Sequence, residues 1–337
     1  MKRHPILFAL LLILVSASCK RDHLYYEGSN TATVIVSPDW SASGVHPNGV
    51  TVYAYNSSDG SLYKRFPPVS AQGNCVIHLG QGDYTLVVMN DTPEEFAGRL
   101  EIVGEDNLAT LQARAVLDNN NCIVEPDTLA VARYDMLHIS QKHLDYYWDK
   151  PDKNSSPDDA LTVTVKPKAA ISEVNIKVHV KGLKYARGTT VSYLRGMAAG
   201  YMIGAEKNSR KEGTHAFILN HRVFDPGSDT DGTITAKLLS FGLPGSTANE
   251  TGVGKSGNSA EGNKYYLESN FVLINGEAYP LSFDVSNQIN TDVSLNLQLS
   301  LNLDLEIELP EVIGNDNGGG FDTEVSDWED EIIDIPM

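Results

Sequence analysis

Two histidines lie five residues apart and have aspartates close by in the sequence. His138 and His143 stand near Asp135 and Asp145. Imidazole nitrogens and carboxylate oxygens can bind a metal ion or exchange protons with a substrate. The alternative, which we favour, is an aromatic and partly buried loop with ordinary histidines. Neither a nucleophile elbow, nor a zinc-protease motif, nor a phosphate-binding glycine loop occurs in the chain, so we predict no enzyme, no metal and no cofactor.

Two further groups of residues have the chemistry to bind a ligand. Tyr146, Tyr147 and Trp148 are consecutive and could stack on a sugar or a peptide, although such residues more often seal the base of a β-sandwich. The segment 225–231 carries three aspartates, whose oxygens suit calcium. It lacks the bidentate glutamate and the spacing of an EF-hand, so we favour a polar turn.

The first residues of the chain have the pattern of a secretion signal that ends at a cysteine. A basic start is followed by an apolar run from Ile6 to Val15 and by small residues before Cys19, as in a secretory signal peptide. The run is too short to cross a bilayer as a helix. Such an ending is typical of bacterial lipoproteins, so we predict cleavage before Cys19 and attachment to a membrane through lipid on its thiol. An ordinary secretion signal with a chance cysteine is the alternative, because Ser16 stands where lipoprotein signals usually carry leucine.

The other cysteines and one threonine are candidates for covalent modification. Export permits a disulfide between Cys75 and Cys122, and two free buried thiols are an equal alternative. Thr128 lies in Asp127-Thr128-Leu129, which resembles a short acceptor pattern for bacterial O-glycosylation.

Composition and charge exclude some classes of protein. Of 337 residues, 41% are hydrophobic and 21% charged, which is enough to form buried cores. The formal charge is −18, and residues 304–337 contain twelve acidic residues and neither lysine nor arginine. Nucleic acids require basic surfaces, so we predict no nucleic-acid partner.

Most of the chain reads as short strands separated by turns. Apolar and polar residues alternate in the segments 161–165 and 174–180, which predicts strands with one buried face. We expect short helical pieces around Leu108 to Leu117 and a helical turn over Gly196 to Tyr201. The Pro/Ser/Asp cluster near residue 155 reads as a loop between two halves. We therefore predict an all-β protein of two β-sandwiches in series. The predicted segments are a signal peptide (1–18), a tether (19–30), an N-terminal sandwich (31–160), a C-terminal sandwich (161–310) and a glycine-rich hinge with an acidic segment (311–337).

Two segments near the C-terminus are candidates to pair with another chain. Leucines and one isoleucine alternate with polar residues from Ser294 to Glu308, as in a single long strand. After Gly320, apolar residues including Trp328 occur among acids. Such segments could lie along a sheet edge, so we predict partner binding by β-strand addition.

A resemblance to a known family rests on motifs in both halves. The motifs are Val52-Tyr53-Ala54-Tyr55, Gly82-Asp83-Tyr84-Thr85-Leu86, Leu161-Thr162-Val163-Thr164-Val165, Leu194-Arg195-Gly196-Met197-Ala198 and Asp231-Gly232-Thr233-Ile234-Thr235. In their order and spacing they resemble a Bacteroides-type lipoprotein family of unknown function, DUF5119. That family is similar to the fimbrillin-like FimB/Mfa2 anchor subunits of pili.

The resemblance implies a fold, a place and a partner. The fold would be two tandem transthyretin-like (fimbrillin-like) β-sandwich domains. The protein would be a pilus anchor or accessory subunit at the outer membrane and the cell surface, with Cys19 as its lipid attachment and other fimbrial subunits as partners. A carbohydrate- or peptide-binding outer-membrane lipoprotein, which would use Tyr146, Tyr147 and Trp148, is the alternative function.

Overall fold

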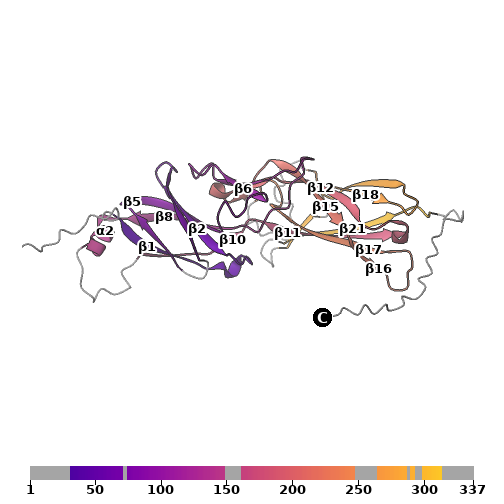
Figure 1. Ribbon diagram of the computed structural model, residues 1–337, viewed down its shortest axis with the longest axis horizontal. Coiled ribbons are helices and arrows are strands. Elements are labelled where there is room, and N and C mark those ends of the chain that lie inside the picture. Colours follow the sequence, from indigo (N-terminus) through magenta and orange to yellow (C-terminus); the bar gives the residue numbers. More distant parts are fainter. Residues whose placement is uncertain are drawn as a thin grey trace, which may run out of the picture.

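The described part of the protein is an elongated arrangement of β-sheets with one sandwich near each end (Figure 1). The structure is a computed structural model, and it describes residues 31–70, 74–148, 161–246, 264–286, 289–292 and 298–312. It confirms the prediction of an all-β, sandwich-type fold. No helix in these residues is long and apolar enough to cross a membrane.

The first sandwich packs a three-stranded sheet against a five-stranded sheet. The strand orders are β4-β1-β9 and β10-β8-β5-β2-β3. The strands are β1 (Ala32–Pro38), β2 (Gly49–Asn56), β3 (Leu62–Ser70), β4 (Cys75–Leu79), β5 (Gly82–Asn90), β8 (Ala130–Ile139), β9 (Leu161–Val165) and β10 (Lys168–Ala169). Inward residues alternate with exposed ones along β4, so Cys75, Ile77 and Leu79 share the core face. A 3₁₀ turn (Trp40–Ala42) and helix α2 (Gln141–Trp148) complete this end.

The first sandwich continues beyond residue 160. β9 lies parallel to β1, with Val36 opposite Val163, and β10 pairs with the start of β8. The division into two domains near residue 160 stays a prediction. The strand pairing groups residues 161–169 with the N-terminal sheets.

The second sandwich also consists of two sheets around one core. Their orders are β16-β17-β11-β21-β20 and β15-β12-β18-β19. The strands are β11 (Ser172–Lys181), β12 (Thr190–Ala198), β15 (Glu212–Leu219), β16 (His221–Phe224), β17 (Gly232–Ser240), β18 (Tyr266–Val272), β19 (Ala278–Asp284), β20 (Ile289–Asp292) and β21 (Gln298–Glu308). Val174, Ile176, Val178 and Val180 of β11 all enter the core, as their alternation predicts. A 3₁₀ turn (Leu183–Tyr185) follows β11.

The long predicted strand at the C-terminus is internal to its sheet only at its start. β21 begins at Gln298, since residues 293–297 lie outside the described part of the chain. It runs parallel to β11 along its length, and its first residues, 298–301, also pair with β20. The candidate edge element is therefore enclosed on both sides at its start.

A third core joins the two sandwiches. Strands β6 (Leu100–Val103) and β7 (Gln112–Ala115) form one small sheet with β13 (Gly200–Met202) and β14 (Lys207–Asn208). A 3₁₀ turn (Ile203–Ala205) lies between β13 and β14. A Cβ atom on Gly200 would lie 2.5 Å from the Ala113 carbonyl oxygen, so this close pairing requires glycine. The predicted helical pieces around 108–117 and 196–201 are wrong, because long-range pairing makes these segments strands and turns.

Candidate functional site

Several predicted site residues lie where the structure gives no side-chain description. Cys19 is outside the described residues, and so is the acidic segment after Gly320. The backbone of Tyr146, Tyr147 and Trp148 forms the end of α2, but their side chains are not described. Lipid attachment and ligand stacking at these residues therefore stay predictions.

The two histidines do not converge on one site. His138 Nδ1 lies 2.6 Å from Asp83 Oδ1 on an exposed surface. His143 Nδ1 instead accepts a hydrogen bond from the Ser140 N–H at 3.0 Å. Asp135 Oδ1 accepts from Arg133 Nε at 2.8 Å. Across the described ranges, no group of three His, Cys, Asp or Glu residues could hold a metal ion.

Cys75 and Cys122 are both buried free thiols, the second of the two alternatives. Burial raises the pKa of Cys75 to about 11. Burial and the nearby Asp118 carboxylate also raise the pKa of Cys122. Both thiols are therefore protonated near neutral pH and are poor nucleophiles.

Two aspartates of the segment 225–231 form hydrogen bonds to neighbouring residues of the protein. Asp225 Oδ2 lies 2.7 Å from His179 Nε2. Asp231 Oδ1 accepts from the Gly182 N–H at 2.8 Å and from the Thr230 hydroxyl at 2.9 Å. These hydrogen bonds lower the pKa of Asp231. Two of the three carboxylates, those of Asp225 and Asp231, are therefore already bonded within the sandwich.

Thr128 is exposed, and its amide donates to Asp127 Oδ1 at 2.7 Å. Its carbonyl accepts from Asn90 Nδ2 at 3.0 Å, while the next residue, Leu129, is fully buried. The backbone is thus fixed on both sides of an accessible hydroxyl. The O-glycosylation of Thr128 stays a prediction.

One edge of the second sandwich carries backbone groups that no described residue pairs with. The Ile123 N–H donates to the Thr214 carbonyl at 2.7 Å from the side of β15 opposite β12. Backbone polar groups alternate in direction along an antiparallel strand, so those of Ala216 and Ile218 also point away from β12. Within the described residues, the parallel bridge between Ile123 and His215 covers the start of this edge, up to the Ala216 N–H, and Ile218 lies beyond it without a partner strand.

The same edge continues into β16. Asp225 N donates to the Asp231 carbonyl where the β16–β17 hairpin ends. By the same alternation, the backbone groups of Arg222 and Phe224 point away from β17. We call Ala216, Ile218, Arg222 and Phe224, together with the residues between them, the β15–β16 edge.

The β15–β16 edge is apolar as well as unpaired. Ile218 is 51% exposed, Val223 55% and Phe224 45%. Val191 on β12 lies directly opposite Ile218 and is 46% exposed. A row of unpaired backbone groups beside exposed apolar side chains is the surface to which an extended segment adds as a new strand.

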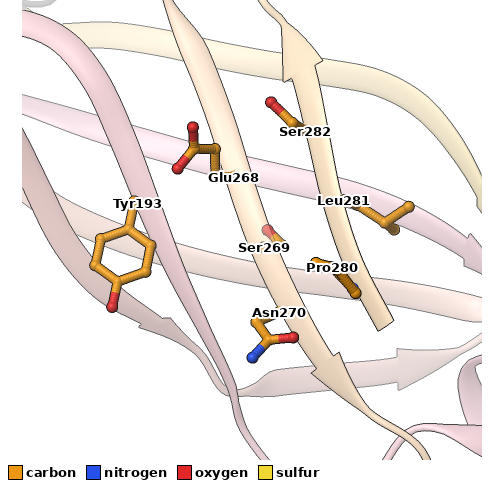
Figure 2. A pocket seen from close by; sticks show the side chains of 7 residues that line it. All are labelled: Tyr193, Glu268, Ser269, Asn270, Pro280, Leu281 and Ser282. Carbon is orange, nitrogen blue, oxygen red and sulfur yellow. The ribbon is translucent and has the colours of Figure 1, made fainter. Parts of the chain in front are cut away.

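A shallow pocket lies on the outer face of the same sheet. It has a volume of about 250 Å³ and is lined by residues of β12, β18 and β19: Tyr193, Glu268, Ser269, Asn270, Pro280, Leu281 and Ser282. Figure 2 shows Tyr193 on one side, Pro280 and Ser282 on the other, and Glu268 and Asn270 between them. The Glu268 carboxylate is held by Arg195, with Nη2 2.8 Å from Oε2.

Neither the edge nor the pocket follows from the sequence motifs. The sequence around residues 215–219 gives no reason to leave this strand unpaired. The sequence does indicate the opposite edge of this sheet. Pro280 lies within β19, and a proline within a strand is typical of an edge strand.

Comparisons with known proteins agree with this architecture. The model of a family described as a domain of unknown function (DUF5119) matches residues 18–217. A crystal structure of a candidate adhesin from Bacteroides ovatus is similar at a TM-score of 0.55 and 20% identity, over 84% of this chain and 94% of that one. The fimbrial anchor protein Mfa2 from Porphyromonas gingivalis aligns at a TM-score of 0.48 and 14% identity, over 81% and 90% of the two chains. No curated protein sequence matches significantly.

Proposed function

The chain belongs to the DUF5119 family, and from this premise we propose that it is a non-enzymatic subunit of a fimbrial polymer on the cell surface. It holds its partner by β-strand addition at the β15–β16 edge. It is held to the outer membrane by lipid on Cys19, as an anchor or accessory subunit. Its partners are other fimbrial subunits.

The observation that carries the proposal is the exposed apolar character of an unpaired edge. A soluble protein normally protects such an edge with charge, proline or a covering segment. Ile218, Val223 and Phe224 are about half exposed instead. An added strand would bond to the free backbone groups of β15 and β16 and cover these side chains.

The shared fold is in agreement with this role. The Bacteroides ovatus protein whose fold this chain shares is assigned as a candidate adhesin. A β-sandwich supplies stiff sheets whose edges can be extended by a partner.

The strand-addition proposal is tested with full-length tagged protein purified from detergent-solubilised envelopes. Ile218→Lys places a charge on the edge, and we expect it to reduce the amount of copurified fimbrial chains by about tenfold or more. Val76→Lys on β4 is the matched control, since Val76 is 53% exposed on an edge strand of the other sandwich. Equal recovery of fimbrial chains with Ile218→Lys and with the unchanged protein would rule out this edge.

The lipid anchor has its own test. Cells labelled with radioactive palmitate should incorporate label into the unchanged protein and none into Cys19→Ala. The variant should move from the membrane fraction to the soluble fraction, because acyl chains supply the membrane affinity. Label or membrane attachment that persists in Cys19→Ala would refute anchoring at Cys19 without affecting the strand-addition proposal.

A further inference from the structure

The pocket on β12, β18 and β19 has polar groups that the protein itself leaves unused. Within the described residues, the Tyr193 hydroxyl, the Asn270 amide and the Ser282 hydroxyl have no hydrogen-bond partner. They stand around the mouth of the pocket, with Glu268 between Tyr193 and Ser282 (Figure 2). Unpaired polar groups that converge on one pocket can bind a ligand's hydrogen-bonding groups without breaking an existing bond.

The other side-chain surfaces that line the pocket are mostly apolar. The Tyr193 ring and the Pro280 ring form opposite sides of it. The face of an aromatic ring carries partial negative charge and attracts C–H groups, which carry partial positive charge. A fitting ligand therefore combines a C–H face with hydroxyl groups at its rim.

The charges near the pocket favour a neutral ligand. Glu268 is the one charged residue that lines it, and Arg195 already neutralises Glu268. The Glu268 carboxylate would repel an anion. A metal ion would have this one carboxylate as a ligand, and the carboxylate is already paired with Arg195. The volume of about 250 Å³ lies just below the usual range for drug-sized ligands, roughly 300–1,000 Å³, so the pocket admits one ring at a time.

From this combination we infer that the pocket binds one sugar ring of a neutral glycan. The ring's C–H face stacks on Tyr193, and its hydroxyls bond to Asn270, Ser282 and the Glu268 carboxylate. The inference does not depend on strand addition, because the pocket lies on the sheet face and not on the β15–β16 edge. It also differs from a site at Tyr146, Tyr147 and Trp148, which belong to α2 near the other end of the molecule (Figure 1).

The test uses full-length protein in detergent on an array of neutral and sialylated oligosaccharides. We expect binding to a subset of the neutral oligosaccharides, because each immobilised chain offers its rings to the open pocket. Tyr193→Ala should weaken this binding by about tenfold, since the stacking surface is lost. Tyr134→Ala is the matched control, because Tyr134 is an exposed tyrosine on β8 of the other sandwich and its loss should change nothing.

Two milder variants guard against a folding defect. Tyr193→Phe keeps the ring and removes the hydroxyl, and Asn270→Ala removes the amide from an exposed position. Each should weaken binding by a few fold and leave the thermal unfolding midpoint unchanged. The inference is overturned if no neutral oligosaccharide binds, if only sialylated ones bind, or if all three pocket variants bind as the unchanged protein does.

Discussion

The two outer edges of the sheet β15-β12-β18-β19 differ in how they meet solvent. At β19, Leu273 N donates to Glu277 O and Val285 N donates to Tyr265 O. By alternation, the backbone of Pro280 points away from β18. Proline removes a donor from this free edge without costing a bond inside the sheet.

The opposite edge has no such protection. At the corresponding outward positions of β15 stand Ala216 and Ile218, and both retain their N–H groups. Each strand also carries one acidic residue at an outward position near one end, Glu212 on β15 and Asp284 on β19, so charge does not distinguish the two edges. A proline within an edge strand resists the addition of another strand. The comparison indicates that one edge of this sheet is protected while the other is left able to bind.

The largest expected effect comes from giving β15 the proline that β19 already has. Ile218→Pro removes an outward donor and leaves the bonds to β12 intact, as Pro280 does on the other edge. Loss of a few main-chain bonds and of apolar contact should weaken partner binding by about 2–4 kcal/mol, roughly 30- to 1,000-fold. Copurification of fimbrial chains measures the loss. Ala278→Pro on β19 is the control and should leave recovery unchanged.

Acid should loosen β15 selectively. His215 is buried, and its Nε2 lies 3.0 Å from the Ser240 hydroxyl oxygen. That oxygen also accepts from the Gly242 N–H, and a neutral His215 Nε2 either donates to it or accepts from it according to the tautomer. Burial lowers the pKa of His215 from 6.5 to about 4. The folded state therefore binds fewer protons than the unfolded state between these values, and stability present above pH 6.5 is lost as the pH falls toward 4.

At pH 5 this linkage should reduce the free energy of unfolding by about 2 kcal/mol relative to pH 7. Denaturant titrations at both pH values measure the change, and His215→Gln should abolish this part of it. Hydrogen exchange should rise in β15 and stay constant in β19. An equal fall in stability in His215→Gln would contradict the assignment.

The covered start of β15 offers a smaller test. A Cβ atom on Gly213 would lie 2.5 Å from Ile123 Cδ1, in the segment that bridges to Thr214. Gly213→Ala should displace Ile123 and cost about 1–2 kcal/mol of folding free energy by overpacking, as measured by denaturant unfolding. Adding Ile123→Val removes the clashing methyl and should restore part of the loss. No recovery in the double variant would place the strain elsewhere.

The smallest effect is expected from removing the protection of β19. Pro280→Val restores the outward donor and should produce weak self-association, with a dissociation constant on the order of 0.1–1 mM. Sedimentation equilibrium measures it. Adding Ser282→Lys should return the protein to monomer, and a variant that stays monomeric without the lysine would show that proline is not what protects this edge.

Local patterns were sufficient to predict the strands. Alternation correctly predicts the core faces of β11 and β9, because each strand buries one face whatever its neighbour. The segment around Leu111 was predicted wrongly. β7 pairs with the preceding strand β6 on one side and with β13, almost ninety residues later, on the other, and nothing near it in the sequence encodes this second partner.

The candidate site is harder to predict for the same reason. An edge is defined by the absence of a neighbour, which depends on the order of all strands in the sheet. Ala216 and Ile218 would read the same in a central strand. Pro280 is the exception, because its missing N–H marks an edge within the sequence itself. The pocket similarly combines three strands whose register brings Tyr193, Glu268 and Ser282 into one row.

The most direct test of strand addition at the β15–β16 edge is site-specific photocrosslinking on cells. A benzophenone amino acid replaces Ile218 in one variant and Ser282, at an outward position of β19, in another. Strand addition at this edge predicts a crosslinked product that contains a fimbrial subunit from position 218 and none from position 282. Crosslinking of a fimbrial subunit from position 282 alone, or from neither position, would contradict it.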